Sequence, residues 1–311
     1  MSKIIVAGAG AFGTALALAI ERPLTLTGRN MAPIMANRRS PRLPDALLPA
    51  QIGLEEDPLI TPDDILLLTI PMQALSGYLK TLNGTPKVAI ACCKGIELET
   101  ARRPTDVISD ALNCPTAVLT GPSFATDISQ GKPTALTLAC TDPTLGRQLQ
   151  TALTSDTLRL YLSGDPIGAE LGGALKNVIA IACGVCMGAG LGESARAALM
   201  TRGMAETNRL ALKLGAHPET SHGLSGFGDL ALTCTSPQSR NYSFGYALGA
   251  GDPPPEGKTV EGRATAQATL KLAATHKIDM PITKVVADLV CEEINLGQAL
   301  DALLSRPLKS E

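Results

Sequence analysis

Short apolar segments alternate with helical patterns along the first half of the chain. The helical patterns Thr14–Ile20 and Thr105–Leu112 fall between segments that are rich in aliphatic residues. Some of those segments are apolar without alternation, as in Ile65-Leu66-Leu67-Leu68, which is typical of strands covered on both faces. The predicted strands are Lys3–Ala7, Leu24–Thr27, Ile65–Ile70, Lys87–Cys92, Thr116–Thr120 and Thr134–Cys140. This alternation predicts an α/β, doubly wound domain with a mainly parallel sheet.

The pattern becomes helical after Gly164. Asp165 can cap a helix, and Pro166 suits the first turn of one. Loop-like stretches interrupt the helical patterns at Ser225–Asp229, at Ser236–Asn241 and in the Gly/Pro-rich segment Gly249–Gly257. The predicted helices are Ile167–Met187, Ser194–Leu214, Glu261–His276 and Pro281–Leu289. We therefore expect residues 1–164 to form the doubly wound domain and residues 165–311 to form an all-α helical domain.

Composition limits the class of partner. The 311 residues are 45% hydrophobic and 18% charged, as is ordinary for a folded globular chain. The formal net charge is −2, aromatic residues make up 3%, and Trp is absent. A nucleic-acid groove or an anionic membrane surface needs a concentrated basic field, and base stacking needs aromatic platforms. The sequence therefore points to a small-molecule partner.

The apolar segments do not predict a membrane span, and the cysteines and histidines do not predict a metal site. The most apolar later segment, Val178–Leu191, contains three glycines, so we expect a buried helix rather than a span. No secretion signal is evident at the amino terminus, and the eight cysteines read as reduced residues of a cytoplasmic protein. Cys183 and Cys186 have the spacing of a redox motif but lie in an apolar run, and no two of the three histidines have metal-ligand spacing.

A glycine-rich motif directly follows the first predicted strand. Gly8, Gly10 and Gly13 form G-x-G-x-x-G, and a predicted helix begins immediately after it. In a dinucleotide-binding (Rossmann) domain the first glycine permits a tight turn and the second lets the backbone approach a pyrophosphate. The third allows the helix to pack closely, and the free N–H groups of the helix meet the anion. The position of the motif predicts dinucleotide binding.

The end of the second predicted strand bears on the choice of cofactor. NAD-specific domains usually place Asp or Glu there, next to the ribose 2′-hydroxyl. Here the strand is followed by Gly28-Arg29-Asn30, with no carboxylate. Arg29 can stack on adenine and pair with a 2′-phosphate. We expect NADPH to be preferred, with NADH also used.

Several polar residues stand in places that a fold alone does not explain. Lys94 and the segment Gly121-Pro122-Ser123 follow predicted strands, at the sheet edge where doubly wound domains bind ligands. Lys176 precedes Asn177 inside an otherwise apolar helix, and a buried ammonium is costly unless it is paired or functional. The two loop-like stretches add a carboxylate, Asp229, and an arginine, Arg240.

Six ordered segments resemble the NAD(P)-dependent glycerol-3-phosphate dehydrogenases, the bacterial branch in particular. They are GAGAFGTALA, KGIE, GPSFA, LGGALKNVIAIACG, GLSGFGDLALTCTSPQSRN and VEG, and the resemblance extends from residue 4 to about residue 283. It implies an oxidoreductase that reduces dihydroxyacetone phosphate to sn-glycerol 3-phosphate, which feeds glycerophospholipid synthesis. It also implies a cytoplasmic protein; a homodimer is left open.

The resemblance also implies a role for each matched position. Lys176 matches the acid–base lysine, with Asp229 as its orienting partner and Lys94 as a second stabiliser of charge. The implied substrate contacts are Lys94, Gly121, Ser123, Lys176, Asn177, Asp229, Thr233, Ser239, Arg240 and Asn241. The implied cofactor contacts are Gly8, Gly10, Ala11, Phe12, Gly13, Arg29, Lys94, Ala125, Arg240, Thr259 and Glu261. Two positions depart from the family pattern. Ala11, in the glycine motif, stands where the family commonly has serine, and Thr259 stands where it often has a bulkier β-branched residue.

Two other functions remain open from the sequence. A β-hydroxyacid dehydrogenase of the 6-phosphogluconate or hydroxyisobutyrate type also pairs a Rossmann domain with a helix lysine followed by asparagine. A non-catalytic NADPH sensor would keep only the glycine motif. The Gly-Phe-Gly-Asp and Ser-Arg-Asn segments favour the glycerol-phosphate enzymes over the first, and the Lys176 and Asp229 pair argues against the second.

Overall fold

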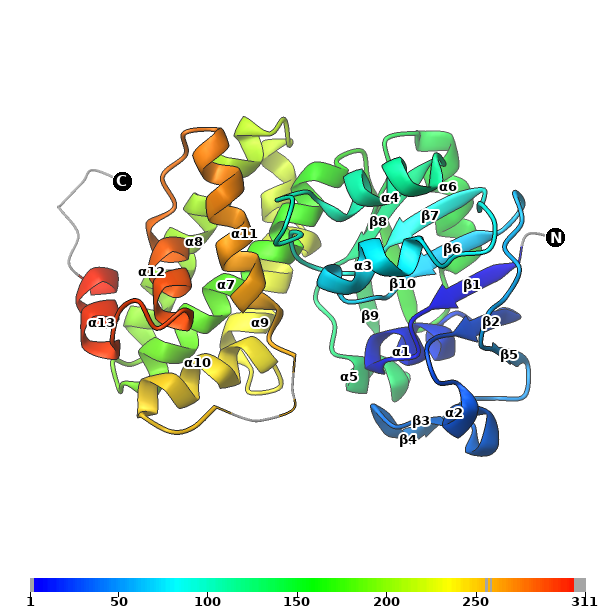
Figure 1. Ribbon diagram of the computed structural model, residues 1–311, viewed down its shortest axis with the longest axis horizontal. Helices are drawn as coiled ribbons and strands as arrows, with labels where there is room; N and C mark the ends of the chain where they lie inside the picture. Colours follow the sequence, from blue (N-terminus) through cyan, green and yellow to red (C-terminus); the bar gives the residue numbers. More distant parts are fainter. Residues whose placement is uncertain (1–2, 255–256, 258, 305–311) are drawn as a thin grey trace. The chain divides into compact units, whose positions relative to one another are not determined.

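The computed structural model describes residues 3–254, 257 and 259–304. The chain divides into two compact units (Figure 1). The first unit consists of residues 1–94 and 103–170, and the second of residues 95–102 and 171–311. The compact units thus divide within a helix, between Glu170 and Leu171, and a short loop from the first half of the chain goes with the second unit. The predicted division at residue 164 stays a prediction.

The first unit is built on an eight-stranded sheet with the order β10-β9-β8-β7-β6-β1-β2-β5. Every neighbouring pair is parallel except β8 and β9, which are antiparallel. The chain leaves β1 towards β2 on one side and later returns to β6 on the other. The sheet therefore has its topological switch point between β1 and β6, where doubly wound folds bind ligands. The strands are β1 (Ile4–Ala7), β2 (Leu24–Thr27), β5 (Ile52–Glu55), β6 (Ile65–Leu68), β7 (Val88–Ala91), β8 (Thr116–Thr120), β9 (Thr134–Ala139) and β10 (Leu158–Ser163).

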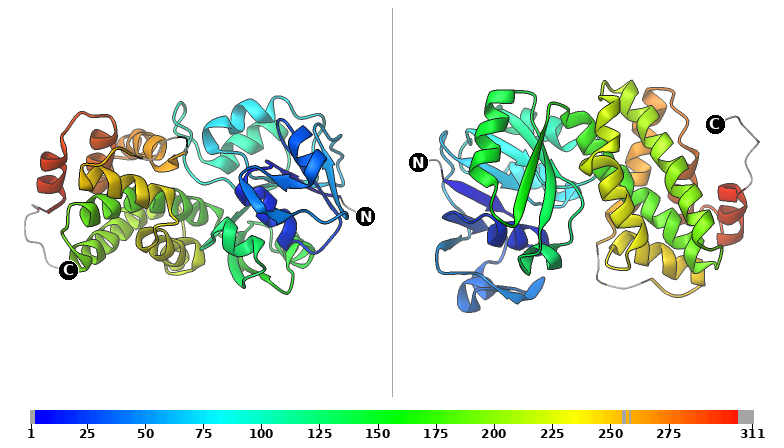
Figure 2. Two further views of the ribbon diagram at one scale, coloured as in Figure 1. Left: turned by 90° about the horizontal axis from the view of Figure 1, so that it is seen from below. Right: turned by 180° about the vertical axis from the view of Figure 1, so that it is seen from behind.

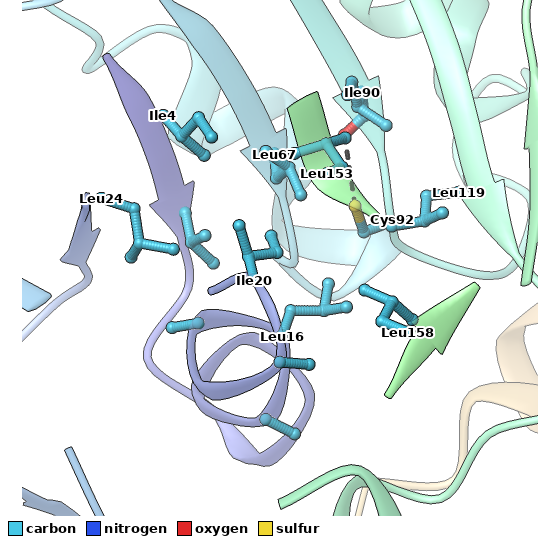
Figure 3. Close-up of a cluster of buried hydrophobic side chains, with 14 of the residues drawn as sticks. Ile4, Leu16, Ile20, Leu24, Leu67, Ile90, Cys92, Leu119, Leu153 and Leu158 are labelled. Atoms are coloured by element: carbon cyan, nitrogen blue, oxygen red, sulfur yellow. Dashed lines mark hydrogen bonds between the residues drawn. The ribbon is translucent and has the colours of Figure 1, made fainter. Parts of the chain in front are cut away.

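Helices cover both faces of this sheet, as the second view in Figure 2 also shows. Side chains alternate along a strand, so Ile4 and Val6 of β1 face one layer while Ile5 and Ala7 face the other. Figure 3 shows the first layer, where Leu16 of α1 lies among strand side chains. The helices of this unit are α1 (Ala11–Ala19), α2 (Ala32–Asn37), α3 (Met72–Leu79), α4 (Pro104–Leu112), α5 (Ala125–Ser129) and α6 (Pro143–Leu153).

A small antiparallel hairpin completes the first unit. Its strands are β3 (Arg39–Ser40) and β4 (Leu43–Leu47), and they form a separate two-stranded sheet after α2. Arg38 has a left-handed backbone (φ 56°) and donates hydrogen bonds to the carbonyls of Leu48, Pro49 and Ile52 at 2.6–2.8 Å. These bonds fix the hairpin to the segment that leads into β5.

The second unit is all-helical. It contains α7 (Pro166–Gly188) from Leu171 onwards, α8 (Glu193–Lys213), α9 (Asp229–Thr235), α10 (Arg240–Ala250), α11 (Glu261–Thr275), α12 (Pro281–Val290) and α13 (Leu296–Leu304). Residues 168–186 of α7 are all buried. With 23 residues and high hydropathy, α7 is long enough to span a membrane, but 89% of its apolar window is buried inside the protein. It is a core helix, as expected.

Glycines let α7 and α10 approach backbone to backbone. A Cβ at Gly245 of α10 would lie 2.1 Å from the carbonyl oxygen of Ile181, and one at Gly249 would lie 2.2 Å from that of Val185. The contact is reciprocal, because a Cβ at Gly184 of α7 would lie 2.2 Å from the carbonyl oxygen of Tyr242. Only residues without a side chain fit at these positions.

The structure confirms the predicted fold class and corrects parts of the second half. The stretch Ser225–Asp229, expected as a loop, is helical: Leu224–Gly228 forms a π-helical turn and Asp229 begins α9. Arg240 and Asn241, also expected in a loop, form the first turn of α10. The glycines of Ser225–Asp229 suggested a loop, but they are needed for close packing. A Cβ at Gly226 would lie 2.1 Å from the carbonyl oxygen of Ser221. The predicted cap holds, since Gly168 N donates to Asp165 Oδ1 at 2.9 Å.

Candidate active site

The glycine motif forms a tight turn at the switch point of the sheet. Gly8 has φ +115°, and a Cβ there would lie 2.5 Å from Thr69 Oγ1. A Cβ at Gly13 would lie 1.9 Å from the carbonyl oxygen of Gly8, so the third glycine is what lets α1 pack on the turn. A Cβ at Gly10, in contrast, would meet nothing within 4 Å. The middle glycine therefore borders open space that a ligand can enter.

This turn fits the pyrophosphate of a dinucleotide. Gly10 is the N-cap residue of α1, and no side chain caps this helix end. Backbone N–H groups at such an end attract anions, and the helix dipole adds a partial positive charge. Ala11 and Phe12 lie in the first turn of α1, and Ala125 is the first residue of α5, a helix that packs against α1. All three residues therefore lie on or next to the helix that the glycine motif begins, and their role in cofactor binding stays a prediction.

A second polar group lies where β7 and β8 end. Lys94 Nζ donates to the carbonyl oxygen of Gly121 at 3.2 Å, and Ser123 Oγ donates to the same oxygen at 3.2 Å. Gly121 has φ +141°, a conformation that favours glycine. The structure therefore brings these three predicted residues together at the carboxyl edge of the sheet.

The helical unit holds a buried lysine–aspartate pair. Lys176 Nζ on α7 donates to Asp229 Oδ1 at 2.5 Å and to Thr233 Oγ1 at 2.9 Å, both on α9. Thr233 Oγ1 in turn lies 2.6 Å from the carbonyl oxygen of Asp229, one helical turn earlier. Lys176 is 7% exposed, and Asp229 is fully buried. Three predicted residues thus form one hydrogen-bonded centre in which a charged ammonium is matched by a carboxylate.

An amide network fixes the backbone next to this lysine. Asn241 Nδ2 on α10 donates to Asn177 Oδ1 on α7 at 2.9 Å. Asn241 Oδ1 accepts from the backbone N–H of Gly262 on α11, also at 2.9 Å. A Cβ at Gly262 would lie 2.7 Å from the carbonyl oxygen of Asn177, so glycine is required for this approach. Three helices are tied together at the residue that follows Lys176.

The remaining predicted residues are near the ends of helices. Ser239 is buried and caps α10, because its Oγ accepts from Tyr242 N at 3.2 Å. Arg240 and Thr259 are exposed, and Glu261 is the partly buried first residue of α11. The guanidinium of Arg240 makes no hydrogen bond or ion pair with another residue in the described part of the chain. The structure therefore does not by itself assign these residues to a ligand.

Two supporting residues escaped the sequence analysis. Thr69 Oγ1 lies 2.8 Å from the carbonyl oxygens of Ala7 and Gly8, where it holds the first turn of the glycine motif. Ser40 Oγ, on β3, donates to the carbonyl oxygen of Ala9 at 2.9 Å. Thr69 is the one polar residue within the predicted strand Ile65–Ile70, a signal that could have marked it. Ser40 lies 31 residues from Ala9 in a segment without a strong pattern, so no local signal marked it.

Burial keeps several cysteines in the thiol form. It raises the pKa of Cys92, Cys186 and Cys234 above the ordinary value for a thiol. All eight cysteines are free. Within the described residues, no group of three His, Cys, Asp or Glu side chains could hold a metal ion. The candidate chemistry therefore rests on the glycine motif and the Lys176 centre.

Two models of one protein family together match most of the chain. The family model for the N-terminus of NAD-dependent glycerol-3-phosphate dehydrogenase matches residues 3–146, and the model for its C-terminus matches residues 165–301. The glycerol-3-phosphate dehydrogenase [NAD(P)+] of Cereibacter sphaeroides is 54% identical, with 98% of this chain and 99% of the relative covered. The enzyme of the same name from Roseobacter denitrificans is 52% identical over the same shares.

A solved structure agrees with this result. The crystal structure of glycerol-3-phosphate dehydrogenase from Coxiella burnetii is 33% identical and superposes with a TM-score of 0.90, over 98% of this chain and 99% of that one. The match covers both the glycine motif and the helical unit that carries Lys176. This chain belongs to the NAD-dependent glycerol-3-phosphate dehydrogenase family.

Proposed function

We propose that the protein catalyses the reversible reduction of dihydroxyacetone phosphate to sn-glycerol 3-phosphate, with NADPH preferred over NADH. The observation that carries the proposal is the buried Lys176–Asp229 pair with Thr233. Such a pair is expensive to build, because both charges lose water on burial. The presence of this buried pair beside an apolar helix favours a chemical role for Lys176 over a merely structural one.

Lys176 acts on the oxygen of the substrate ketone. When bound, the nicotinamide cofactor supplies the hydride that adds to the carbonyl carbon. The electron pair of the carbonyl bond then moves to oxygen, and an N–H of the Lys176 ammonium donates the proton that completes the alcohol. Asp229 and Thr233 hold the ammonium in place. In the reverse direction the neutral amine accepts the proton.

Other polar residues are assigned to substrate binding. Arg240, with its exposed guanidinium, and Asn241 at the start of α10 are suited to the substrate phosphate, since Arg forms bidentate contacts with phosphate. Lys94 and Ser123, which share the Gly121 carbonyl, place a second cation and a hydroxyl at the sheet edge. Asn177 and Asn241 position the backbone of α7 next to Lys176.

The direct test is a spectrophotometric assay of NADPH oxidation with dihydroxyacetone phosphate. We expect loss of NADPH absorbance and formation of sn-glycerol 3-phosphate in equal amounts. The same assay with 3-hydroxyacids and NADP+ examines the β-hydroxyacid dehydrogenase alternative. Turnover of hydroxyacids but not of dihydroxyacetone phosphate would overturn the proposal, and NADPH binding without turnover of either would favour the sensor.

The cellular role follows from this reaction and is part of the proposal. A cytoplasmic enzyme of this kind supplies sn-glycerol 3-phosphate, the backbone that glycerophospholipid synthesis acylates. All residues assigned to the proposed chemistry come from one chain, so the reaction does not depend on a second copy. A homodimer is part of the proposal only as an arrangement compatible with this chemistry. The oligomeric state is measured by light scattering of the purified protein.

A further inference from the structure

The hairpin β3–β4 lies against the glycine motif, although it is far from it in the sequence. Ser40 on β3 is completely buried and donates through Oγ to the carbonyl oxygen of Ala9, between the first two glycines. The backbone N–H of Arg42 donates to Ser40 Oγ at 3.3 Å. Arg42 is therefore two hydrogen bonds away from Ala9, and its side chain is exposed.

The end of β2 meets the same residue from another direction. A Cβ at Gly28 would lie 3.0 Å from Ala9 N and 3.2 Å from Ala9 Cβ, so the backbone of Gly28 packs on Ala9. Arg29 follows Gly28 directly and is exposed. Two arginines that are 13 positions apart in sequence thus start from backbone anchored to Ala9.

The arginines of this region divide into two groups. Arg38 uses its guanidinium on three backbone carbonyls, and Arg39 Nη1 donates to the carbonyl oxygen of Pro44 at 2.9 Å. These two residues hold the hairpin together. In the described part of the chain, the guanidiniums of Arg29 and Arg42 make no hydrogen bond or ion pair. They are the two cations left for a ligand.

We propose that Arg42 is a further cofactor-selecting residue, which binds the 2′-phosphate of NADPH together with Arg29. The inference rests on the proposed preference for NADPH and adds a second residue from a different element. A phosphate monoester presents three oxygens and close to two negative charges, which suit two guanidiniums. The hairpin contact through Ser40 fixes the distance of Arg42 from the glycine motif.

Carboxylates also lie at this end of the sheet, where β5 ends at Glu55 and is followed by exposed Glu56 and Asp57. Thr27 Oγ1 donates to the backbone carbonyl of Glu56 at 2.9 Å, which places exposed Glu56 beside the end of β2. A carboxylate here favours a ribose 2′-hydroxyl and opposes a 2′-phosphate. Glu55 at the end of β5 is paired with Lys3, but Glu56 and Asp57 follow it, and Arg29 alone does not offset their negative charge. Arg42 adds a second positive charge, which favours a 2′-phosphate over a 2′-hydroxyl.

The test measures binding rather than turnover. Dissociation constants for NADPH and NADH are obtained from cofactor fluorescence, and those for 2′,5′-ADP and 5′-AMP by calorimetry, with wild type and Arg42→Ala. We expect Arg42→Ala to weaken NADPH and 2′,5′-ADP at least about tenfold, the size of a lost charge-assisted contact. NADH and 5′-AMP should change less than about twofold, because they lack the phosphate.

A matched control separates this contact from a loss of general positive charge. Arg159 is an exposed arginine on β10, the edge strand at the opposite end of the sheet, and Arg159→Ala removes the same charge. We expect Arg159→Ala to leave all four dissociation constants unchanged. Arg42→Lys should keep part of the discrimination, because it keeps the charge and loses the fork.

The outcomes distinguish the inference from the function on which it rests. If wild type binds 2′,5′-ADP no better than 5′-AMP, the preference for NADPH fails and the inference fails with it. If wild type discriminates and Arg42→Ala does so equally well, Arg29 suffices and the inference alone is wrong. Equal weakening of all four ligands by Arg42→Ala would also overturn it, since that result indicates a role in the fold of the hairpin.

Discussion

A single ammonium in an apolar helix is the most informative residue of the chain. Lys176 stands between Leu175 and Asn177, and its surroundings on α7 are buried. An isolated charge there would cost several kcal/mol in lost hydration. Asp229 and Thr233 offset this cost with two short hydrogen bonds. The pair is therefore held in one geometry, as proton transfer requires.

Replacing Lys176 is the sharpest test of the mechanism. We expect Lys176→Ala to lower kcat by about 10³-fold, because general-acid assistance and stabilisation of developing charge are both lost. Lys176→Arg should restore little, since a guanidinium gives up its proton poorly. The dissociation constant for NADPH should barely change, because the glycine motif belongs to the other compact unit.

Circular dichroism and thermal melting provide the fold check for both Lys176 variants. The variant Lys176→Ala leaves the buried Asp229 carboxylate without its cation, so some loss of stability is expected. The decisive quantity is kcat of the folded fraction. A folded Lys176→Ala protein that retained a tenth or more of its kcat would remove Lys176 from the acid–base role.

Arg240 carries a separate prediction about the substrate phosphate. A charge-assisted contact is worth roughly 1.5–3 kcal/mol, so Arg240→Ala should raise KM for dihydroxyacetone phosphate at least about tenfold. Dihydroxyacetone, which lacks the phosphate, should be a poor substrate of wild type and variant alike. Equal proportional losses with both substrates would show that Arg240 does not hold the phosphate.

At the scale of elements, backbone contact between α7 and α10 shapes the helical unit. Four glycines make this contact: Gly184 and Gly188 on α7, and Gly245 and Gly249 on α10. A Cβ added to any of them would lie within 2.2 Å of a carbonyl oxygen on the other helix. Close approach brings more atoms into van der Waals contact than larger side chains at these positions would permit. It also sets the start of α10, where Asn241 reaches Asn177.

We expect Gly245→Ala to destabilise the protein by about 1–3 kcal/mol, because the added methyl group must push the two helices apart. Gly77→Ala is the control: Gly77 lies inside α3, and a Cβ there would meet nothing within 4 Å. That change should stabilise the protein by about 0.5–1 kcal/mol through helix propensity. Urea unfolding of both variants measures the difference, and similar effects at both sites would contradict the packing argument.

Six of the eight strands of the main sheet were predicted, whereas β5 and β10 were missed, and so were elements that depend on tertiary contact. The strands β6 and β7 are found within the predicted bounds, because continuous apolar runs identify buried strands. The hairpin β3–β4 was missed, since β3 is only two residues long, β4 contains a proline, and the hairpin is fixed by Arg38 bonds to carbonyls further along the chain. Antiparallel pairing of β8 and β9 leaves no local signal either.

The same distinction applies to the candidate site. Lys176 stood out because a charge in an apolar helix breaks the pattern, and the glycine motif stood out by spacing. Its partner Asp229 was assigned through family resemblance and was expected in a loop, whereas it begins α9. Nothing in the sequence marked Ser40, whose role comes from a contact made 31 residues away. The VEG segment contains Gly262, but it gave no sign of the contact that Gly262 makes with Asn241, 21 residues away.

At the scale of the whole molecule, the chain passes between the compact units more than once. It leaves the first unit after Lys94, returns at Arg103 and leaves again after Glu170. Glu170 is buried and ties two of these points together: its carboxylate accepts from Arg103 Nη1 at 3.2 Å and from Thr105 N at 2.7 Å. A single carboxylate therefore links the amino end of α4 to α7.

This link predicts a pH dependence of stability. Burial raises the pKa of Glu170 from 4.5 to about 7, an effect that Arg103 and the Thr105 hydrogen bonds only partly oppose. The folded protein then holds this proton more tightly than the unfolded chain, so stability falls as the pH rises from about 4.5 to about 7. Above and below that pH range, Glu170 should not make stability change with pH.

Glu170→Gln isolates the contribution, since glutamine keeps a hydrogen-bond acceptor and does not titrate. We expect the free energy of unfolding of wild type, relative to Glu170→Gln, to fall by up to about 3 kcal/mol between pH 4.5 and pH 7.5. Arg103→Met should extend the fall to higher pH, because Arg103 is the cation that lowers the pKa of Glu170. Urea unfolding followed by circular dichroism at half-unit pH steps measures all three curves. Parallel curves for wild type and Glu170→Gln would show that Glu170 does not titrate in this range, and that the carboxylate between α4 and α7 stays charged throughout.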